Sequence, residues 1–271
     1  MRHFLLSFCL LFTFSNTWSQ NRSIEFESTG TFSEVLAKAK AENKLVFIDA
    51  YTTWCGPCKW MSKNIFTNDT IADYFNSNFI NAKIDMEKGE GIDIAKKYDV
   101  RCYPNLLFVD GDGNLVHRSA GAAQEIQSYI TMGDKAMSKD DNYASVMKRY
   151  AEQKVKDPKQ IADIIDMMAT TCLSFSSYID DYYTTVKPED FTDSLSWKIL
   201  YNYVDDMDHQ AFKHLMDHQE DYSAIYGKDS VMGKIEYVYQ RKASKLLFAR
   251  EFDEKAYKTY VNKISTMDFA S

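Results

Sequence analysis

The chain has 271 residues, of which 45% are hydrophobic and 26% charged, and its formal net charge is -7. This apolar content is enough to build a buried core, which excludes disorder as a description of the whole chain. Because phosphate binding needs a concentrated Lys/Arg surface, the acidic balance argues against a nucleic-acid partner.

The first 20 residues have the order of a secretory signal peptide. A basic start at Arg2 precedes the apolar run 4–14, which is followed by small and polar residues up to Ser19. This run is shorter than the roughly 20 residues that span a bilayer, and no later segment comes close to that length. We therefore expect residues 1–20 to be removed, and the mature chain to be exported to a bacterial periplasm without stable membrane insertion.

From residue 24 to 137 the pattern alternates between strands and helices. We expect strands at 24–26, 44–51, 79–85, 105–109 and 115–118, helices at 32–42, from the cysteine turn to 66, at 70–76, 92–98 and 122–137, and a hairpin turn at 110–114. Strands and helices in this order predict an α/β domain at 21–137, with a central mixed sheet flanked by helices.

The strand signals end near residue 140. Aromatic residues then recur at helical spacing, as Tyr178 and Tyr182 do, which predicts an all-α domain at 138–271. Pro158 and Pro188 lie where helices can start, and their separation hints at repeated helix pairs. We interpret the many Tyr, Phe and Met residues of this half as core in preference to a groove for extended clients.

Residues 54–58, Trp-Cys-Gly-Pro-Cys, come directly after a buried strand and directly before a helix. A cysteine at the amino terminus of a helix meets unpaired N–H groups and the positive end of the helix dipole, which favour the attacking thiolate. Cys55 is therefore the expected nucleophile. The two-residue spacing brings Cys58 round one helical turn, close enough to resolve the mixed disulfide that Cys55 forms with a partner.

This motif in its context resembles the thioredoxin family, and more narrowly the exported thioredoxin-like domains that serve periplasmic disulfide reduction. The resemblance covers about residues 24–137 and implies a thioredoxin fold. It implies that Asp49, six residues before the nucleophile, is buried beneath the pair and accepts the proton of the resolving thiol. It also implies a cis-proline at Pro104, beside which the backbone of Tyr103 pairs with an extended client. The residues expected to contact the client are Trp54, Gly56, Pro57, Tyr103 and Pro104.

Two further positions depart from the family pattern. The residue after the proline is commonly Thr and is Asn105 here, and Cys102 adds a thiol two residues before Pro104. Cys102 is either a third redox position, a regulatory disulfide or a buried small hydrophobe, and we favour the last because free cysteines are among the most buried residues. For the same reason we expect Cys172, in an apolar helical stretch, to be buried without chemistry.

Metal sites are a weaker interpretation of these motifs. A C-x-x-C pair also occurs in zinc sites, but no second pair follows to complete four ligands. We interpret His209, His214 and His218 as a solvated helix surface, and 110–114 as a turn in preference to a calcium loop. We expect no metal and no cofactor beyond the redox-active disulfide of Cys55 and Cys58.

The predicted function is an exported thiol–disulfide oxidoreductase that reduces disulfides in protein clients. Because the Gly-Pro dipeptide matches thioredoxin itself, we expect the pair to donate electrons and to be recharged by a membrane-bound electron donor. Two alternatives remain: a disulfide isomerase or oxidase, and a non-catalytic adaptor that binds a partner through the helical domain.

Overall fold

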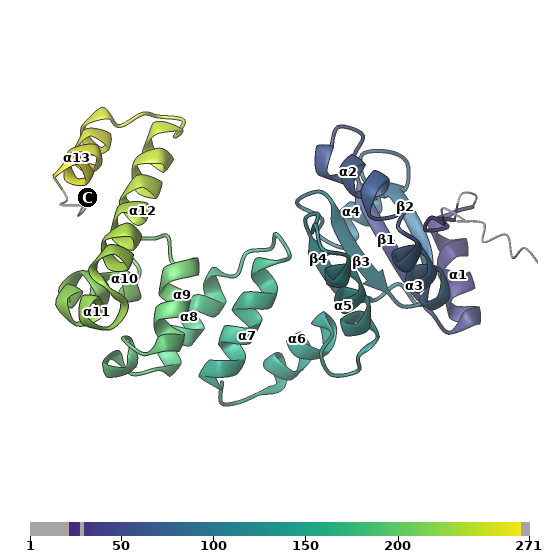
Figure 1. Cartoon of the computed structure of the whole chain (residues 1–271), viewed down its shortest axis with the longest axis horizontal. Helices are drawn as coiled ribbons and strands as arrows, with labels where there is room; N and C mark the ends of the chain where they lie inside the picture. Colours follow the sequence, from purple (N-terminus) through teal and green to yellow (C-terminus); the bar gives the residue numbers. More distant parts are fainter. Residues whose placement is uncertain (1–21, 28–29, 267–271) are drawn as a thin grey trace, which may run out of the picture.

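The computed structural model describes residues 22–27 and 30–266, so the expected signal peptide lies outside the described residues. Figure 1 shows a sheet-containing unit, from which the later helices of the chain extend to one side. Within the described ranges, no helix is both long and apolar enough to cross a membrane. The elements of the first unit are α1 (Phe32–Glu42), β1 (Leu45–Tyr51), α2 (Gly56–Asn64), α3 (Asp69–Asn78), β2 (Phe79–Asp85), α4 (Gly91–Lys97), β3 (Asn105–Val109), β4 (Leu115–Ala120) and α5 (Ile126–Met137).

The sheet has the strand order β2-β1-β3-β4 and is mixed, as predicted. β1 pairs in parallel with β2, while β3 is antiparallel to both β1 and β4. In this register Asp49, in the middle of β1, lies beside Lys83 of β2 and Leu106 of β3. An acidic residue on the inner strand β1 therefore lies beside a basic residue on the edge strand β2.

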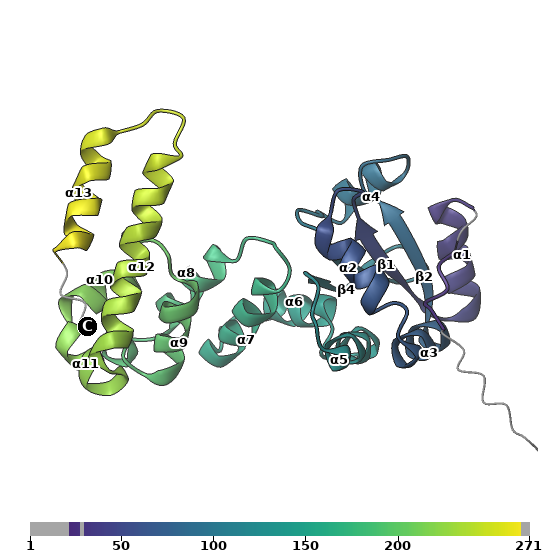
Figure 2. The same cartoon turned by 45° about the horizontal axis from the view of Figure 1, so that its top comes forward.

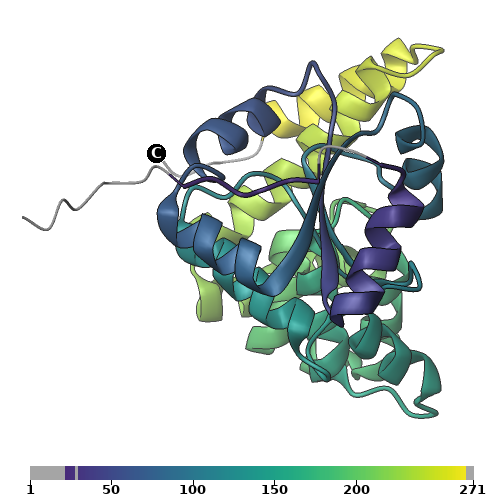
Figure 3. The ribbon, with the colours of Figure 1, turned by 90° about the vertical axis from the view of Figure 1, so that its right-hand side faces the viewer.

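The alternation of side chains along β1 divides the core between the two faces of the sheet. Phe47 packs in a cluster with residues of α2, α3 and α5, whereas Val46 and Ile48 pack with residues of α1 and α4. Figure 3 shows purple α1 on one side of the strands and the blue helices α2 and α3 on the other. Because Asp49 is two residues after Phe47, its side chain points to the face that α2 covers.

The later part of the chain is entirely helical in the described residues. Many of its aromatic residues, such as Tyr182 and Tyr222, belong to one buried cluster, which confirms their interpretation as core, whereas Phe248 and Phe252 are exposed. Figure 2 shows the α12–α13 hairpin at the end farthest from the sheet. The elements are α6 (Tyr143–Glu152), α7 (Pro158–Ala169), α8 (Ser176–Thr185), the 3-10 turn η1 (Pro188–Asp190), α9 (Ser194–Tyr203), α10 (Gln210–Asp217), α11 (Gln219–Tyr226), α12 (Lys228–Leu247) and α13 (Glu254–Ser265).

The expected strands and helices of the first unit are present, with two differences in detail. The strand expected at 24–26 is a single bridge between Phe26 and Asn81, because the backbone N–H of Ile24 donates to Phe66 instead of to a strand. The last helix starts at Ile126, four residues later than expected. The hairpin turn is confirmed, since the Asp110 carboxylate accepts hydrogen bonds from the backbone N–H groups of Asp112 and Asn114.

Phe108 tests how much the first unit depends on the core beneath α2, α3 and α5. It is fully buried, and its ring contacts those of Phe47 and Phe79. We expect Phe108→Ala to lower the free energy of unfolding by about 3–5 kcal/mol, because it leaves a cavity. Urea denaturation measures this loss. Val155→Ala, at a position that is 85% exposed, is the control, and an equally small effect of both changes would contradict the assignment of Phe108 to the core.

Candidate active site

The two cysteines of the motif lie where β1 gives way to α2. Cys55 is the N-cap residue of α2 and forms a disulfide with Cys58, with the two Cα atoms 5.3 Å apart. The backbone N–H of Cys58 donates to Cys55 Sγ over 3.1 Å. Both cysteines are buried, while Gly56 and Pro57 between them are exposed. The sulfur of Cys55 is thus held against the amino terminus of the helix, where negative charge on sulfur is stabilised.

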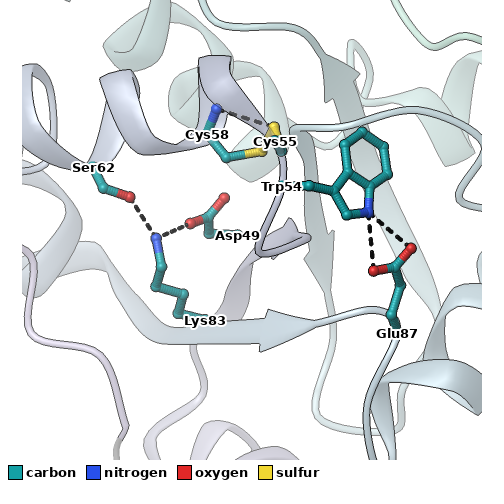
Figure 4. The surroundings of a disulfide bond; sticks show 7 residues. All are labelled: Asp49, Trp54, Cys55, Cys58, Ser62, Lys83 and Glu87. Atoms are coloured by element: carbon teal, nitrogen blue, oxygen red, sulfur yellow. Dashed lines mark hydrogen bonds and ion pairs between the residues drawn. A yellow bond between two sulfur atoms is a disulfide. The ribbon is translucent and has the colours of Figure 1, made fainter.

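Asp49 lies beneath this disulfide. Figure 4 shows its carboxyl between Lys83 and the cysteine pair. Asp49 Oδ2 is 2.6 Å from Lys83 Nζ, and Lys83 also donates to Ser62 Oγ of α2 over 2.5 Å. The second oxygen, Oδ1, is buried without a hydrogen-bond partner among the described residues. Asp49 therefore keeps one acceptor site free beneath the disulfide.

Burial of Asp49 changes the balance between its charged and neutral forms. The side chain has no exposed surface, and its desolvation raises the pKa of the carboxyl above the ordinary value. The positive charge and the hydrogen bond of Lys83 act in the opposite direction and lower this pKa. Desolvation is the larger effect, so Asp49 takes up a proton more readily than an exposed aspartate does.

Lys83 links the buried carboxylate to the surface. Its side chain is 27% exposed, and the ring of Tyr51 lies 4.9 Å from its Nζ. Lys83, Cys58 and Ser62 line a hollow beside the disulfide that opens to solvent. Lys83 therefore contacts the buried carboxylate of Asp49 and also lines a hollow that opens to solvent.

Trp54 and Tyr103 form the exposed rim of the site. The indole N–H of Trp54 donates to both carboxylate oxygens of Glu87, at 3.0 Å each, although Trp54 is 65% exposed. The rings of Trp54 and Tyr103 meet edge to face with centroids 5.8 Å apart. Partial burial is the largest cause that raises the pKa of Tyr103, and the negative charges of Glu87 and Asp85 raise it further.

The proline predicted to be cis is confirmed, since the peptide bond between Tyr103 and Pro104 is cis. The carbonyl of Pro104 accepts a hydrogen bond from the N–H of Gly121, which fixes the loop to the end of β4. Tyr103 itself makes no backbone hydrogen bond to any residue that the structure describes. Its backbone is therefore available to pair with an extended segment of another chain.

The expectation of buried free thiols at Cys102 and Cys172 is wrong. The two form a second disulfide, with Cα atoms 6.3 Å apart and a sequence separation of 70. Cys172 is exposed, in the turn between α7 and α8, and Cys102 is half-buried. The preference of free cysteines for the core misled the prediction, because these residues are joined across two separate parts of the chain.

Sequence reasoning also missed Lys83, Ser62 and Glu87. Lys83 meets Asp49 through the parallel register of β1 and β2, and Ser62 of α2 accepts a hydrogen bond from Lys83. A basic residue in a strand that begins with buried residues was the one available signal for Lys83. Glu87 follows β2 in a turn and carried no signal of its contact with Trp54.

His209, His214 and His218 take part in packing and in capping a helix. His209 caps α10 through a hydrogen bond from Ala211 N–H to Nδ1. The rings of His214 and His218 stack with centroids 4.0 Å apart, and His214 Nδ1 is 3.2 Å from the Tyr222 hydroxyl. Among the described residues no three His, Cys, Asp or Glu side chains gather in a way that would hold a metal ion.

A disulfide at the start of a helix, above a buried carboxylate and beside the contact of Trp54 with the cis-proline loop, defines a thiol–disulfide oxidoreductase of thioredoxin fold. The family model described as Thioredoxin matches residues 23–132. Thioredoxin-1 of Drosophila yakuba is 32% identical over 96 residues, which are 35% of this chain and 85% of that protein. The chain therefore belongs to the thioredoxin family.

Other relatives are matched over smaller parts of their length. Thioredoxin-T of Drosophila melanogaster is 35% identical over 81 residues, 30% of this chain and 48% of that protein, so the chain spans about half of it. The thiol:disulfide interchange protein DsbD of Yersinia pestis is 30% identical over 105 residues, 37% of this chain and 18% of that protein. The solution structure of a candidate disulphide-isomerase from Bacteroides thetaiotaomicron is 43% identical, covers 44% of this chain and 100% of that one, and has a TM-score of 0.39.

The raised pKa of Asp49 makes the stability of the protein depend on pH. A carboxyl whose pKa rises on folding contributes stability below the ordinary Asp pKa, and this contribution is lost as pH rises through the raised value. Asp49→Asn removes the ionisable group, so the variant does not lose this stability as pH rises. Its free energy of unfolding should therefore increase relative to that of the native protein as pH increases through that range. Each unit of pKa shift corresponds to about 1.4 kcal/mol.

Urea unfolding of the oxidised protein from acidic to mildly alkaline pH measures this gain. The exposed Asp93→Asn is the matched control, because it removes a carboxylate away from the buried site. A stability difference for Asp49→Asn that does not change with pH would show that burial of Asp49 does not control its protonation.

Proposed function

We propose that this protein is an exported reductase of protein disulfides that uses Cys55 and Cys58 as its dithiol. The observation that carries the proposal is the position of the Cys55–Cys58 disulfide above Asp49, which has a free, buried acceptor oxygen. The adjacent loop offers the unpaired backbone of Tyr103 to a client. These features supply a nucleophile, a proton acceptor and a docking edge at one site.

The reaction proceeds in two exchanges of sulfur. The Cys55 thiolate attacks one sulfur of the client disulfide, a mixed disulfide forms, and the other client sulfur leaves as a thiolate that takes up a proton. Cys58 then attacks the Cys55 sulfur and releases the second client thiolate. The client has gained two electrons and two protons, and the Cys55–Cys58 disulfide has formed.

Asp49 acts in the second exchange. Cys58 must lose its proton before it attacks, and the buried carboxylate, with its raised pKa, is suited to accept that proton near neutral pH. The proton then leaves Asp49 for solvent at the hollow beside Cys58, which Lys83 lines while it keeps its positive charge. The positive charge of Lys83 also stabilises the ionised carboxylate of Asp49, which is the form that accepts the proton.

Electron donation is favoured over oxidation because the two residues between the cysteines are Gly56 and Pro57, as in thioredoxin, whose potential is about −270 mV. Of the relatives, DsbD is named as a thiol:disulfide interchange protein. In an oxidising compartment a reductase must itself be reduced, so a membrane-bound electron donor belongs to the proposal. Export rests on the signal-peptide pattern of residues 1–20.

The reduction potential of the Cys55–Cys58 pair decides the direction of electron flow. Equilibrating the mature protein in glutathione or dithiothreitol buffers, followed by alkylation and mass spectrometry of the peptide with Cys55 and Cys58, measures it apart from the second disulfide. We expect a value below about −230 mV. A value of about −180 to −120 mV would contradict the reductase and indicate an isomerase or an oxidase instead.

The order of the two thiols predicts which variant retains its client. Cys58→Ser should accumulate a mixed disulfide between Cys55 and insulin, because the resolving thiol is missing, whereas Cys55→Ser should form none. Asp49→Asn should slow resolution by about 10²-fold at neutral pH, because the proton acceptor is lost. Quenched-flow alkylation measures both steps, with Asp93→Asn as control. Resolution at the native rate in Asp49→Asn would remove Asp49 from the mechanism.

A further inference from the structure

The Cys102–Cys172 disulfide joins the helical part of the chain to the loop that carries the cis-proline. Cys102 is followed directly by Tyr103 and Pro104, and Cys172 lies in the turn between α7 and α8. Cys172 adopts a left-handed backbone conformation with a φ of 59°. The crosslink therefore holds a specific turn of the helical part within 6.3 Å, between Cα atoms, of the predicted client-binding loop.

Hydrogen bonds hold the same turn against the sheet. The N–H of Ala120, at the end of β4, donates to the carbonyl of Thr170 over 2.7 Å, and the next N–H, of Gly121, donates to Pro104. The turn is also ordered internally, since the Thr171 hydroxyl donates to Met168 and accepts from the N–H of Leu173. The end of α7, the end of β4 and the cis-proline loop thus form one connected structure.

Beyond this connection α6 lies against β4, where the backbone N–H of Tyr143 donates to Nδ1 of His117, but the apolar clusters of the two parts are separate. The buried clusters of the sheet unit contain residues up to Ala136, and the helical cluster starts at Tyr150. A hollow of about 820 Å³, lined by Gln127, Lys135, Asp163, Asp166 and others, separates α5 and β4 from α7. Because domains without a large shared apolar core can move relative to one another, the covalent crosslink limits how far the turn can move from the cis-proline loop.

The cis-proline loop connects this turn to the reactive disulfide. Tyr103, the neighbour of Cys102, contacts Trp54 with its ring, and Trp54 directly precedes Cys55. A client segment that pairs with the backbone of Tyr103 therefore passes beside residues 170–176. In that turn Leu173 and Phe175 keep part of their apolar surface exposed.

We propose that the Cys102–Cys172 disulfide makes the turn at residues 170–176 a wall of the client-binding site. The inference rests on the proposed function, because it assigns the surface that selects the clients of that reaction. The client it fits is a polypeptide that presents its disulfide on an extended segment with apolar side chains near the cysteine. A small disulfide compound reaches Cys55 without touching the wall.

The double variant Cys102→Ser/Cys172→Ser tests this role with two substrates, insulin and hydroxyethyl disulfide. We expect the KM for insulin to rise about tenfold, which equals about 1.4 kcal/mol of lost binding, while kcat stays within about twofold. Reduction of hydroxyethyl disulfide and the potential of the Cys55–Cys58 pair should not change. Ser177→Ala, an exposed change on α8 that keeps the crosslink, is the matched control.

A second variant covers the case in which the double variant does not fold. Ser174→Arg keeps the crosslink and places a bulky charge on the exposed part of the wall, so it should change the KM for insulin and leave hydroxyethyl disulfide unaffected. The inference is overturned if neither variant changes the KM for insulin. It is also overturned if both substrates slow equally and the potential shifts, because the crosslink then only supports the cis-proline loop.

A further measurement distinguishes failure of the proposed function from failure of the wall. If the native protein does not turn over insulin, reduction is not its function, and the comparison moves to the rate of mixed-disulfide formation in a Cys58→Ser background. That step needs only the attack by Cys55, so a slower reaction with insulin alone still supports the wall. Equal rates with and without the crosslink in this background contradict it.

Discussion

The site depends on one buried charge, the Asp49 carboxylate beneath the disulfide. A lone carboxylate in a protein interior is strongly disfavoured unless it is paired or protonated. Here the parallel register of β1 and β2 brings Lys83 beside it, and Ser62 of α2 binds the same ammonium group. The contacts that make the charge tolerable thus also tie α2, and with it the two cysteines, to the middle of the sheet.

Local sequence pattern predicted the parts of this arrangement that are close together in the chain. The alternation along β1 shows why Asp49 must face α2 once Phe47 is core, and the Pro57 position shows why a helix begins beside Cys55. The resemblance to thioredoxins supplied Pro104. The roles of Lys83 and Glu87 were not predicted, because their partners are 34 and 33 residues away in sequence. Such contacts depend on the register of the strands and on the path of the loops, which no local pattern encodes.

The second disulfide escaped for a different reason. Its two cysteines lie in loops of two parts of the chain whose buried clusters are separate, so hydrophobic periodicity says nothing about their distance. The preference of cysteine for buried positions holds for free thiols, and it gave the wrong environment for Cys172. Only the relative placement of the sheet and the helical part, visible in Figure 1, shows that the two residues meet.

The two disulfides that the structure describes differ in how readily they should be reduced. The reactive pair closes a short turn at a helix amino terminus, which stabilises a thiolate and so eases reduction. The crosslink closes a loop with a sequence separation of 70, which in the chain-entropy model restricts the unfolded state by about 4 kcal/mol and opposes reduction. If the Cys55–Cys58 dithiol donates electrons to clients as proposed, the crosslink in the same chain can stay oxidised. The wall beside the site is thus compatible with the chemistry at its centre.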